Sequence, residues 1–234
     1  MANLIIDIGN TALKAAWADG ITLGRTYRYQ GERMLEFILS LVDKDRPGTI
    51  MLSSVRKFTN DQIARLESAC DRLLIINEGI YDHFSIPSYI TPDRAASIVA
   101  AKYLFQGRKC TIFDFGTMIS IDEIDKDGRY EGGFVSPGCM TRFKSIHRYS
   151  RNLPLIGMPE DADDERLSLS ASISSGVISG IIFEIEGHIC RNPENIVVFT
   201  GGDANYFAKR MKNSIFVVCN LVLLGLALIA DGFE

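Results

Sequence analysis

The segment Leu4-Ile5-Ile6-Asp7-Ile8-Gly9-Asn10-Thr11 decides the fold, because its pattern occurs twice in the chain. A short apolar strand leads into a polar turn, and an extended pattern resumes over residues 13–17. The segment Thr111-Ile112-Phe113-Asp114-Phe115-Gly116-Thr117 has the same order of strand, Asp, apolar residue, Gly and Thr. Such a repeat predicts two related lobes, each opening with a strand and a polar turn.

The segments that follow the two copies alternate between helix and strand patterns. Helical periodicity covers residues 33–42 and 61–70, and β-rich segments follow them at 50–55 and 73–76. Later predicted elements are helices over Pro92–Leu104 and 168–189, strands over 196–199 and 215–218, and a helix from Leu221. This alternation predicts an α/β fold, with one lobe over residues 1–108 and the other over residues 109–234.

The composition is that of a folded protein and limits its partners. The 234 residues are 47% hydrophobic and 23% charged, with a formal net charge of -4 and a pI near 5.5. This balance argues against a broad electrostatic surface, so neither nucleic acid nor a membrane is expected as a partner. The one dense basic run, residues 142–151, is interpreted as a solvated loop or helix face.

The sequence also favours a reducing, cytoplasmic location. Five cysteines are scattered without a CxxC pair or ligand-like spacing, so neither a zinc site nor a disulfide framework is predicted. The N-terminal residues lack the pattern of a signal peptide and are expected to form a first strand. The apolar run 215–230 is shorter than the roughly 20 residues that a membrane helix needs, so a buried strand and a core helix are expected there.

The two polar turns are suited to hold phosphate groups. Gly, Asn and Thr directly after a strand offer backbone N–H groups and short side-chain donors with little obstruction. Asp7 at the mouth of the first turn could hold hydrated magnesium beside those phosphates. One such turn is more typical of an ordinary β-turn, but two copies fit a nucleotide held between two lobes. The chain contains no Gly-x-x-x-x-Gly-Lys-Ser/Thr, so a P-loop is excluded.

A carboxylate that accepts the proton of the attacking hydroxyl is expected at the start of the helix over 92–104. Asp93 is the candidate, because phosphoryl transfer to a hydroxyl needs a positioned base. Arg94 can hold a carboxylate or a phosphate with its planar fork, at a helix start where anions are favoured. The alternative is that Asp93 only stabilises the helix dipole. The three histidines show no partner pattern and are interpreted as structural or surface residues.

These residues resemble the type III pantothenate kinases along nearly the whole chain. Seven blocks agree with that family in order, which is far more specific than any one block. They are Ile5–Thr11, Pro92–Arg94 (the end of Gly-x-Asp-Arg), Asp114–Thr117, Gly132–Gly138 (Gly-Gly-x-Ile-x-Pro-Gly in the family), Leu153-Pro154, Thr200–Asp203 and Leu223–Leu226.

The resemblance implies two ribonuclease-H-like lobes of the acetate and sugar kinase/Hsc70/actin superfamily, assembled as a homodimer. It implies ATP-dependent phosphorylation of pantothenate to 4'-phosphopantothenate, the first step of coenzyme A biosynthesis. It assigns the first nucleotide-binding loop to Asp7, Ile8, Gly9, Asn10, Thr11, Ala12, Leu13 and Lys14. Gly116 and Thr117 would contact ATP, Gly201 and Gly202 would lie near the nucleoside, and Asp114 would bind a monovalent cation, potassium or ammonium.

The same resemblance assigns the substrate to Phe84, Thr91, Pro92, Asp93 and Arg94, with Asp93 as the proton acceptor. Two of these depart from the family, since Thr91 stands for a Gly and Phe84 for a common Tyr. Three further departures are Met118-Ile119-Ser120 after the second turn, Leu169 near the position of a substrate-contacting Thr, and Tyr149-Ser150-Arg151 before Leu153-Pro154. Both turns and the proposed base are intact, so the departures concern substrate affinity more than phosphate chemistry.

Two rival hypotheses follow from these departures. One is a non-catalytic accessory transcription regulator of the same family, which would bind nucleotide at most. The other is a kinase that acts on another small hydroxylated metabolite. Formation of phosphorylated product from pantothenate separates both rivals from a pantothenate kinase.

Overall fold

The computed structural model describes residues 2–43, 45–150, 152–159 and 167–232, which form two compact units. Unit 1 is Met1–Gly107, Ile124–Tyr130 and Asn220–Glu234, and unit 2 is Arg108–Glu123 and Glu131–Cys219. Division into lobes of 1–108 and 109–234 stays a prediction. In the structure, the last helix packs within unit 1, although it follows all of unit 2 in the sequence.

Unit 1 is built on a five-stranded sheet in the order β3-β2-β1-β4-β5. Its strands are β1 (Asn3–Ile8), β2 (Leu13–Asp19), β3 (Thr22–Tyr29), β4 (Thr49–Ser54) and β5 (Arg72–Ile75). β1 pairs antiparallel with β2 and parallel with β4. Leu4, Ile6 and Ile8 on one face of β1 and Ile5 on the other are almost fully buried, as expected for a strand that lies at the centre of a covered sheet.

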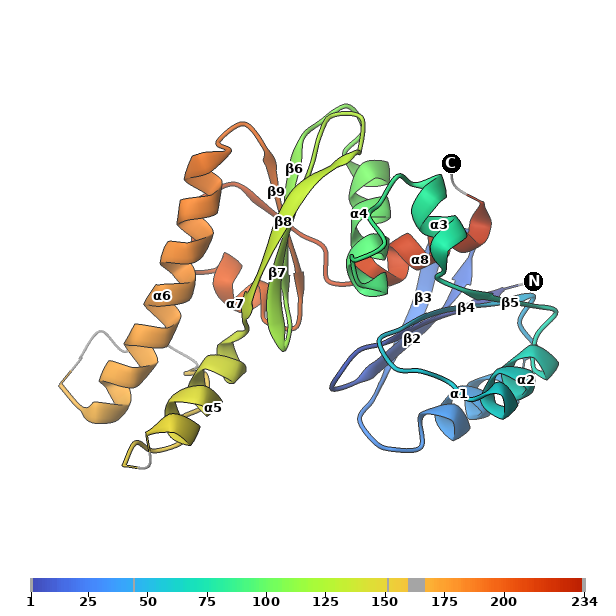
Figure 1. Ribbon diagram of the computed structural model, residues 1–234, viewed down its shortest axis with the longest axis horizontal. Coiled ribbons are helices and arrows are strands. Elements are labelled where there is room, and N and C mark those ends of the chain that lie inside the picture. The colour runs from blue at the N-terminus through green and yellow to red at the C-terminus, as the bar shows by residue number, and fades with distance from the viewer. Residues whose placement is uncertain (1, 44, 151, 160–166, 233–234) are drawn as a thin grey trace. The chain divides into compact units, whose positions relative to one another are not determined.

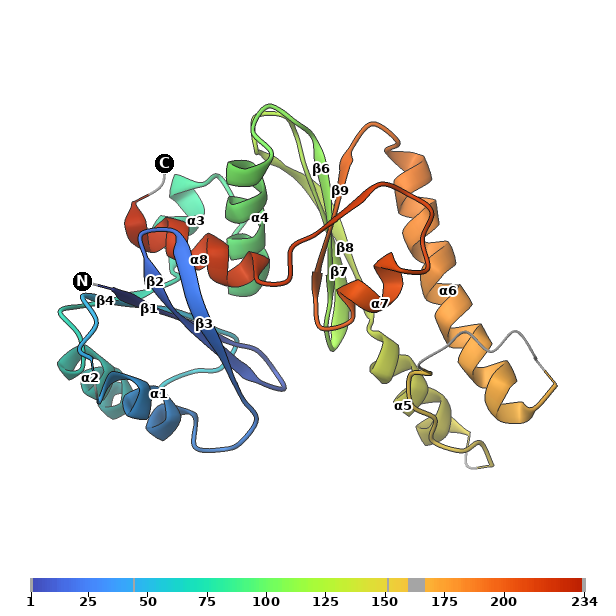
Figure 2. The same cartoon turned by 180° about the vertical axis from the view of Figure 1, so that it is seen from behind.

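Helices cover both faces of this sheet (Figures 1 and 2). α1 (Met34–Val42) and α2 (Asn60–Ser68) pack on the face that Ile6 and Ile8 form. α4 (Pro92–Leu104) and α8 (Leu221–Asp231) pack on each other and lie on the opposite face. A Cβ on Gly225 of α8 would overlap the backbone of Ala96, so this glycine allows the two helices to approach closely. The short helix α3 (Glu78–His83) precedes α4.

Unit 2 repeats the strand order of unit 1. Its sheet has the order β10-β9-β6-β7-β8, and its helices lie between β8 and β9 and between β9 and β10. Its elements are β6 (Cys110–Phe115), β7 (Met118–Ile124), β8 (Tyr130–Pro137), α5 (Cys139–Tyr149), α6 (Leu169–Arg191), β9 (Ile196–Gly201), α7 (Ala204–Ala208) and β10 (Ile215–Val217). Counted from the start of each unit, both sheets read third, second, first, fourth, fifth. The prediction of two related α/β lobes is confirmed.

Phenylalanine rings and one face of α6 form the core of unit 2. The ring centroid of Phe115 lies 4.8 Å from that of Phe199 and 5.1 Å from that of Phe207. α6 is long and apolar enough to cross a membrane by length and composition alone. Its residues Ile181 and Ile185 are nearly fully buried in this core, although only 28% of its apolar stretch is buried. The strand and the core helix expected near the C-terminus are present as β10 and α8. The expectation that the strand is buried is wrong, because it lies at the edge of the sheet and Phe216 is 52% exposed.

The interpretation of the basic run 142–151 as solvated is wrong for its first residue. The run lies mostly in α5, and the side chain of Arg142 is only 22% exposed. Arg142 forms an ion pair with Glu184 of α6 and donates from Nε to the carbonyl oxygen of Pro137 at 2.8 Å. The inward orientation was not visible in the sequence, because the partner carboxylate is far along the chain. Residue 151 lies outside the described residues.

Candidate active site

The first polar turn joins β1 to β2 in unit 1. The N–H of Gly9 donates to the carbonyl oxygen of Ala12 at 3.1 Å, which closes the turn. The guanidinium of Arg56 donates to the carbonyl oxygen of Asn10 at 2.9 Å and braces the turn from outside. The backbone N–H groups of Asn10 and Thr11 meet no acceptor within the described part of the chain, and both residues are exposed. These two N–H groups can therefore serve a ligand, whereas that of Gly9 cannot.

Asp7 lies in a polar row that crosses four strands of the unit 1 sheet. Ser53, Asp7, Lys14 and Arg28 are successive register neighbours on β4, β1, β2 and β3. Cross-strand neighbours share a face, and Ile6 and Ile8 occupy the other one. The carboxylate of Asp7 is buried, and its Oδ1 accepts a hydrogen bond from Ser53 Oγ at 3.1 Å. The row thus places a buried carboxylate and two cationic side chains beside the turn.

The second polar turn joins β6 to β7 in unit 2 and is two residues shorter. Here the N–H of Gly116 donates to the carbonyl oxygen of Met118 at 3.0 Å. The carbonyl oxygen of Thr117 accepts from the N–H of Gly138 at 3.0 Å and from Thr141 Oγ1 at 2.6 Å. A Cβ on Gly138 would overlap the oxygen of Gly116 and lie 2.7 Å from that of Thr117. The glycine before α5 is needed because the turn and the helix start are in contact.

Asp114 is the next-to-last residue of β6 and lies beside the glycine turn at the end of β9. Gly201 has φ +91°, and a Cβ there would overlap Asp114 Oδ1 and lie 2.5 Å from the backbone N of Phe115. The N–H of Asp203 donates to the carbonyl oxygen of Phe115 at 3.3 Å, and burial raises the pKa of the Asp203 carboxyl. These groups lie at the carboxyl ends of parallel strands, the edge where α/β sheets bind ligands.

The start of α4 presents the proposed base. Thr91 is the N-cap with φ -66° and ψ 151°, an ordinary extended conformation, so a residue with a Cβ fits there without backbone strain. Asp93 lies in the first turn, and its Oδ1 is buried without a hydrogen-bond partner among the described residues. Arg94 Nη2 donates to the hydroxyl of Tyr130 at 3.3 Å. A buried carboxylate oxygen that keeps its lone pairs can accept a proton from a ligand.

The segment between α3 and α4 buries two aromatic rings. Phe84 is 8% exposed, and the ammonium of Lys102 lies 5.6 Å from its ring centroid. The hydroxyl of Tyr81 donates to the carbonyl oxygen of Ile90 at 2.8 Å. Burial raises the pKa of the Tyr81 phenol, and the charge of Asp93 raises it further. Phe84 packs inside unit 1, and its role as a substrate contact stays a prediction.

The expected site residues divide between the units. Residues 7–14, 84 and 91–94 lie in unit 1, and Asp114, Gly116 and Thr117 lie in unit 2. Sequence reasoning missed three side chains that bond to the turns, namely Ser53, Arg56 and Thr141. Only their positions in the sequence pointed to these side chains. Ser53 lies near the end of a predicted strand, Arg56 lies just beyond that strand, and Thr141 follows Pro-Gly by a few residues.

The donor groups fit hydrated cations better than a metal held by protein ligands alone. Within the described residues, no group of three or more His, Cys, Asp or Glu side chains could hold a metal ion. Each polar turn instead has a single aspartate at its start, together with hydroxyl and backbone oxygens. Magnesium commonly takes one or two carboxylates and completes its shell with water and substrate phosphates. The residues present therefore fit hydrated magnesium.

The fold defines the class, an α/β protein of two units whose sheets have the same order of strands. A hexokinase of the ROK type from Thermus thermophilus is similar, with a TM-score of 0.52, 15% identity, and coverage of 97% of this chain and 98% of that chain. A proposed Baf family transcriptional activator from Campylobacter jejuni has a TM-score of 0.66, 19% identity, and coverage of 97% and 98%. At these identities the likeness shows the fold alone.

Sequence comparison shows the particular family. Residues 3–191 match the model of the type III pantothenate kinases. The type III pantothenate kinase of Cytophaga hutchinsonii is 35% identical over 237 residues, covering 96% of each chain. That of Flavobacterium psychrophilum is 31% identical over 230 residues, covering 94% of this chain and 95% of the relative.

The chain belongs to the type III pantothenate kinase family. It is therefore a phosphotransferase that uses ATP and acts on a small molecule. The family resemblance found in the sequence is confirmed. The rival interpretation as a transcription regulator is not favoured, because the curated relatives that match over nearly the whole chain are kinases.

Proposed function

We propose that the chain transfers the γ-phosphoryl group of ATP to the primary hydroxyl of pantothenate. The product is 4'-phosphopantothenate, and the reaction is the first step of coenzyme A biosynthesis. The observation that carries the proposal is the start of α4, where Asp93 Oδ1 is buried and accepts no hydrogen bond from the described residues. That oxygen is suited to accept the proton of the attacking hydroxyl.

In this mechanism the chain positions reactants and places charge. The N–H groups of Asn10 and Thr11, with Lys14 beside them, hold phosphate oxygens from the first turn, and Thr117 does so from the second. Asp93 takes the proton as the oxygen attacks phosphorus, and Arg94 holds the substrate with its planar fork. Alignment of this kind supplies most of the catalysis in phosphoryl transfer.

Two cations complete the proposed site. Magnesium would be held through water by Asp7, which Ser53 orients, and potassium or ammonium would be held by Asp114 beside Gly201. When bound, these ions offset the negative charge of the phosphates and of the transferred group. The remaining proposed substrate contacts are Phe84, Thr91 and Pro92.

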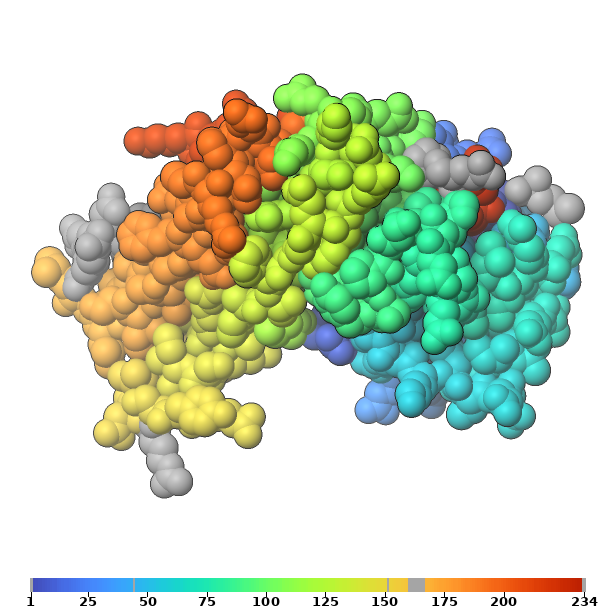
Figure 3. All heavy atoms as spheres, turned by 45° about the horizontal axis from the view of Figure 1, so that its top comes forward, coloured from blue at the N-terminus to red at the C-terminus, as the bar shows by residue number. Residues whose placement is uncertain are grey.

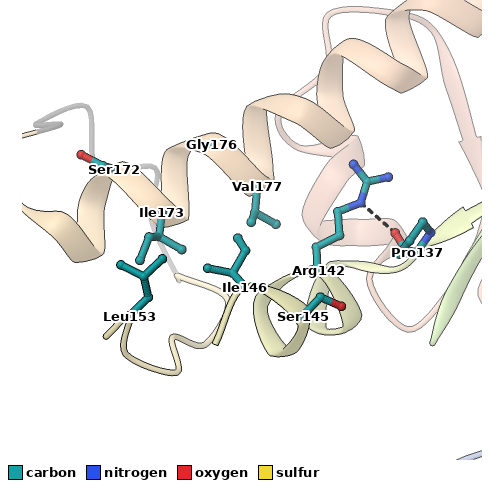
Figure 4. Close-up of a pocket in the computed structure, with 9 residues that line it drawn as sticks. All are labelled: Pro137, Arg142, Ser145, Ile146, Leu153, Ser172, Ile173, Gly176 and Val177. Carbon is teal, nitrogen blue, oxygen red and sulfur yellow. Dashed lines mark hydrogen bonds between the residues drawn. The ribbon is translucent and has the colours of Figure 1, made fainter. Parts of the chain in front are cut away.

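We also propose a cytoplasmic homodimer, with support from the surface of unit 2. α5 and α6 lie side by side there (Figure 3). A hollow of about 640 Å³ between them is lined by apolar side chains that point toward one another, including Ile146, Leu153, Ile173 and Val177 (Figure 4). Phe183 of α6 is 69% exposed. A second copy of the chain would remove this apolar surface from water.

An assay with labelled pantothenate tests the function directly. Purified protein, ATP and magnesium should yield phosphopantothenate, and the rate should depend on added potassium. Asp93→Asn should lower turnover about a hundredfold or more, the scale of a positioned base. Asp82→Asn, which changes an exposed carboxylate of α3, is the matched control and should be close to wild type. No product from pantothenate, with product from another hydroxy acid, would contradict the assigned substrate.

A further inference from the structure

A buried tyrosine below the start of α4 has no role in the mechanism above. Tyr81 belongs to α3 and is 8% exposed, and its hydroxyl donates to the carbonyl oxygen of Ile90 at 2.8 Å. Ile90 directly precedes Thr91, the N-cap of the helix that bears Asp93. The hydrogen bond therefore ties α3 to the backbone from which the proposed base projects.

The same phenol lies within electrostatic reach of the Asp93 carboxylate. Burial is the main cause of the raised pKa of Tyr81, and the charge of Asp93 is the second. A phenol has one proton to donate, and here that proton is used by the carbonyl oxygen of Ile90. Tyr81 therefore cannot also donate a hydrogen bond to Asp93. This accounts for the buried Asp93 Oδ1, which has no donor among the described residues.

We propose that Tyr81 is a positioning residue for Asp93. By holding the Ile90 carbonyl, it fixes the first turn of α4 and keeps its own proton away from the carboxylate. Asp93 Oδ1 then stays oriented and available to the substrate hydroxyl. The inference rests on the proposed role of Asp93 as base, and it requires no contact between Tyr81 and any ligand.

Tyr81→Phe tests the proposal, because it removes the hydroxyl and keeps the ring in its packing. We expect kcat to fall about 5- to 10-fold, the scale of one lost buried hydrogen bond. The KM for ATP should change less than about twofold, since the base aligns the acceptor and adds no ground-state contact to the nucleotide. Tyr89→Phe is the matched control, because Tyr89 lies in the same segment but is 72% exposed. The lost hydrogen bond should lower the Tm of Tyr81→Phe by only about 1–6 °C, and the Tm of Tyr89→Phe should stay close to that of wild type.

A double-mutant cycle with Asp93→Asn separates positioning from general stability. If Tyr81 acts through Asp93, then Tyr81→Phe should cause no further loss of kcat in the Asp93→Asn background. The same fold loss in both backgrounds would overturn the inference and assign Tyr81 a structural role. Full activity of Tyr81→Phe beside an inactive Asp93→Asn would overturn the inference alone. Full activity of Asp93→Asn would overturn both this inference and the proposed base.

Discussion

Substitution of Gly201 by alanine should destabilise the fold more than the same substitution at its neighbour Gly202. The residue has φ +91°, where a residue with a Cβ is strained by about 1–3 kcal/mol. The added Cβ would also overlap Asp114 Oδ1 and lie 2.5 Å from both N and O of Phe115. Overpacking against groups that cannot move freely costs about 1–3 kcal/mol. Together these effects predict a loss of about 2–6 kcal/mol in unfolding free energy.

Thermal unfolding followed by circular dichroism measures this loss. For a chain of this size each kcal/mol lowers Tm by about 2–4 °C, so Gly201→Ala should unfold about 4–24 °C below wild type. Gly202→Ala is the matched control, because its Cβ would only reach the oxygen of Phe115 at 3.9 Å. Displacement of Asp114 should also raise the potassium concentration that half-activates the enzyme. Equal Tm values for the two variants would refute the reasoning.

Three further changes have defined outcomes. Ser53→Ala removes the hydroxyl that donates a hydrogen bond to Asp7 Oδ1. A hydrogen bond to a charged group contributes about 1.5–3 kcal/mol, so steady-state kinetics should show a KM for magnesium-ATP that is at least about tenfold higher. Gly225→Ala should push α8 away from the backbone of Ala96 at a cost of about 1–3 kcal/mol, and should therefore lower the urea midpoint of unfolding. Gly187→Ala is the control and should not lower it, because Gly187 has open space around it. Burial raises the pKa of the Cys139 thiol from 9.0 to about 11. Between these pH values the folded thiol stays protonated while the unfolded thiol ionises. The stability that the buried thiol contributes is therefore lost as pH rises from 9.0 to about 11. Mass spectrometry after iodoacetamide near pH 8 should therefore find exposed Cys190 alkylated before buried Cys139.

The order of the main elements was predictable because it depends on local patterns. The helix over Pro92–Leu104 agrees with α4 at both ends, since a proline opens it and an apolar face runs through it. The strands that begin each unit were equally clear, because each is an apolar run that ends in a polar turn. β3 was missed: its burial is low and its sequence, Thr22–Tyr29, mixes arginine, tyrosine and threonine without an apolar face.

The contacts that complete the site were not predictable, because they join residues far apart in the chain. Ser53 meets Asp7 only after β4 pairs in parallel with β1, and Arg142 meets Glu184 only after α5 packs on α6. Thr91 shows a different limit of sequence reasoning. It stands where the family motif has a glycine, but its backbone has an ordinary extended conformation that any residue can adopt. The departure therefore changes what faces the ligand without straining the chain.

The two polar turns have similar sequences but are not equivalent structurally. In both, the glycine N–H is used inside the turn, by the oxygen of Ala12 in unit 1 and by that of Met118 in unit 2. The sequence pattern predicts phosphate contacts from the whole turn, and with both glycine N–H groups in use the proposed contacts fall to Asn10, Thr11 and Thr117. Lys14 and the buried Asp7 lie beside the first turn, whereas the second turn accepts a hydrogen bond from the N–H of Gly138. A loss of charge should therefore harm the first turn most, and added bulk should harm the second.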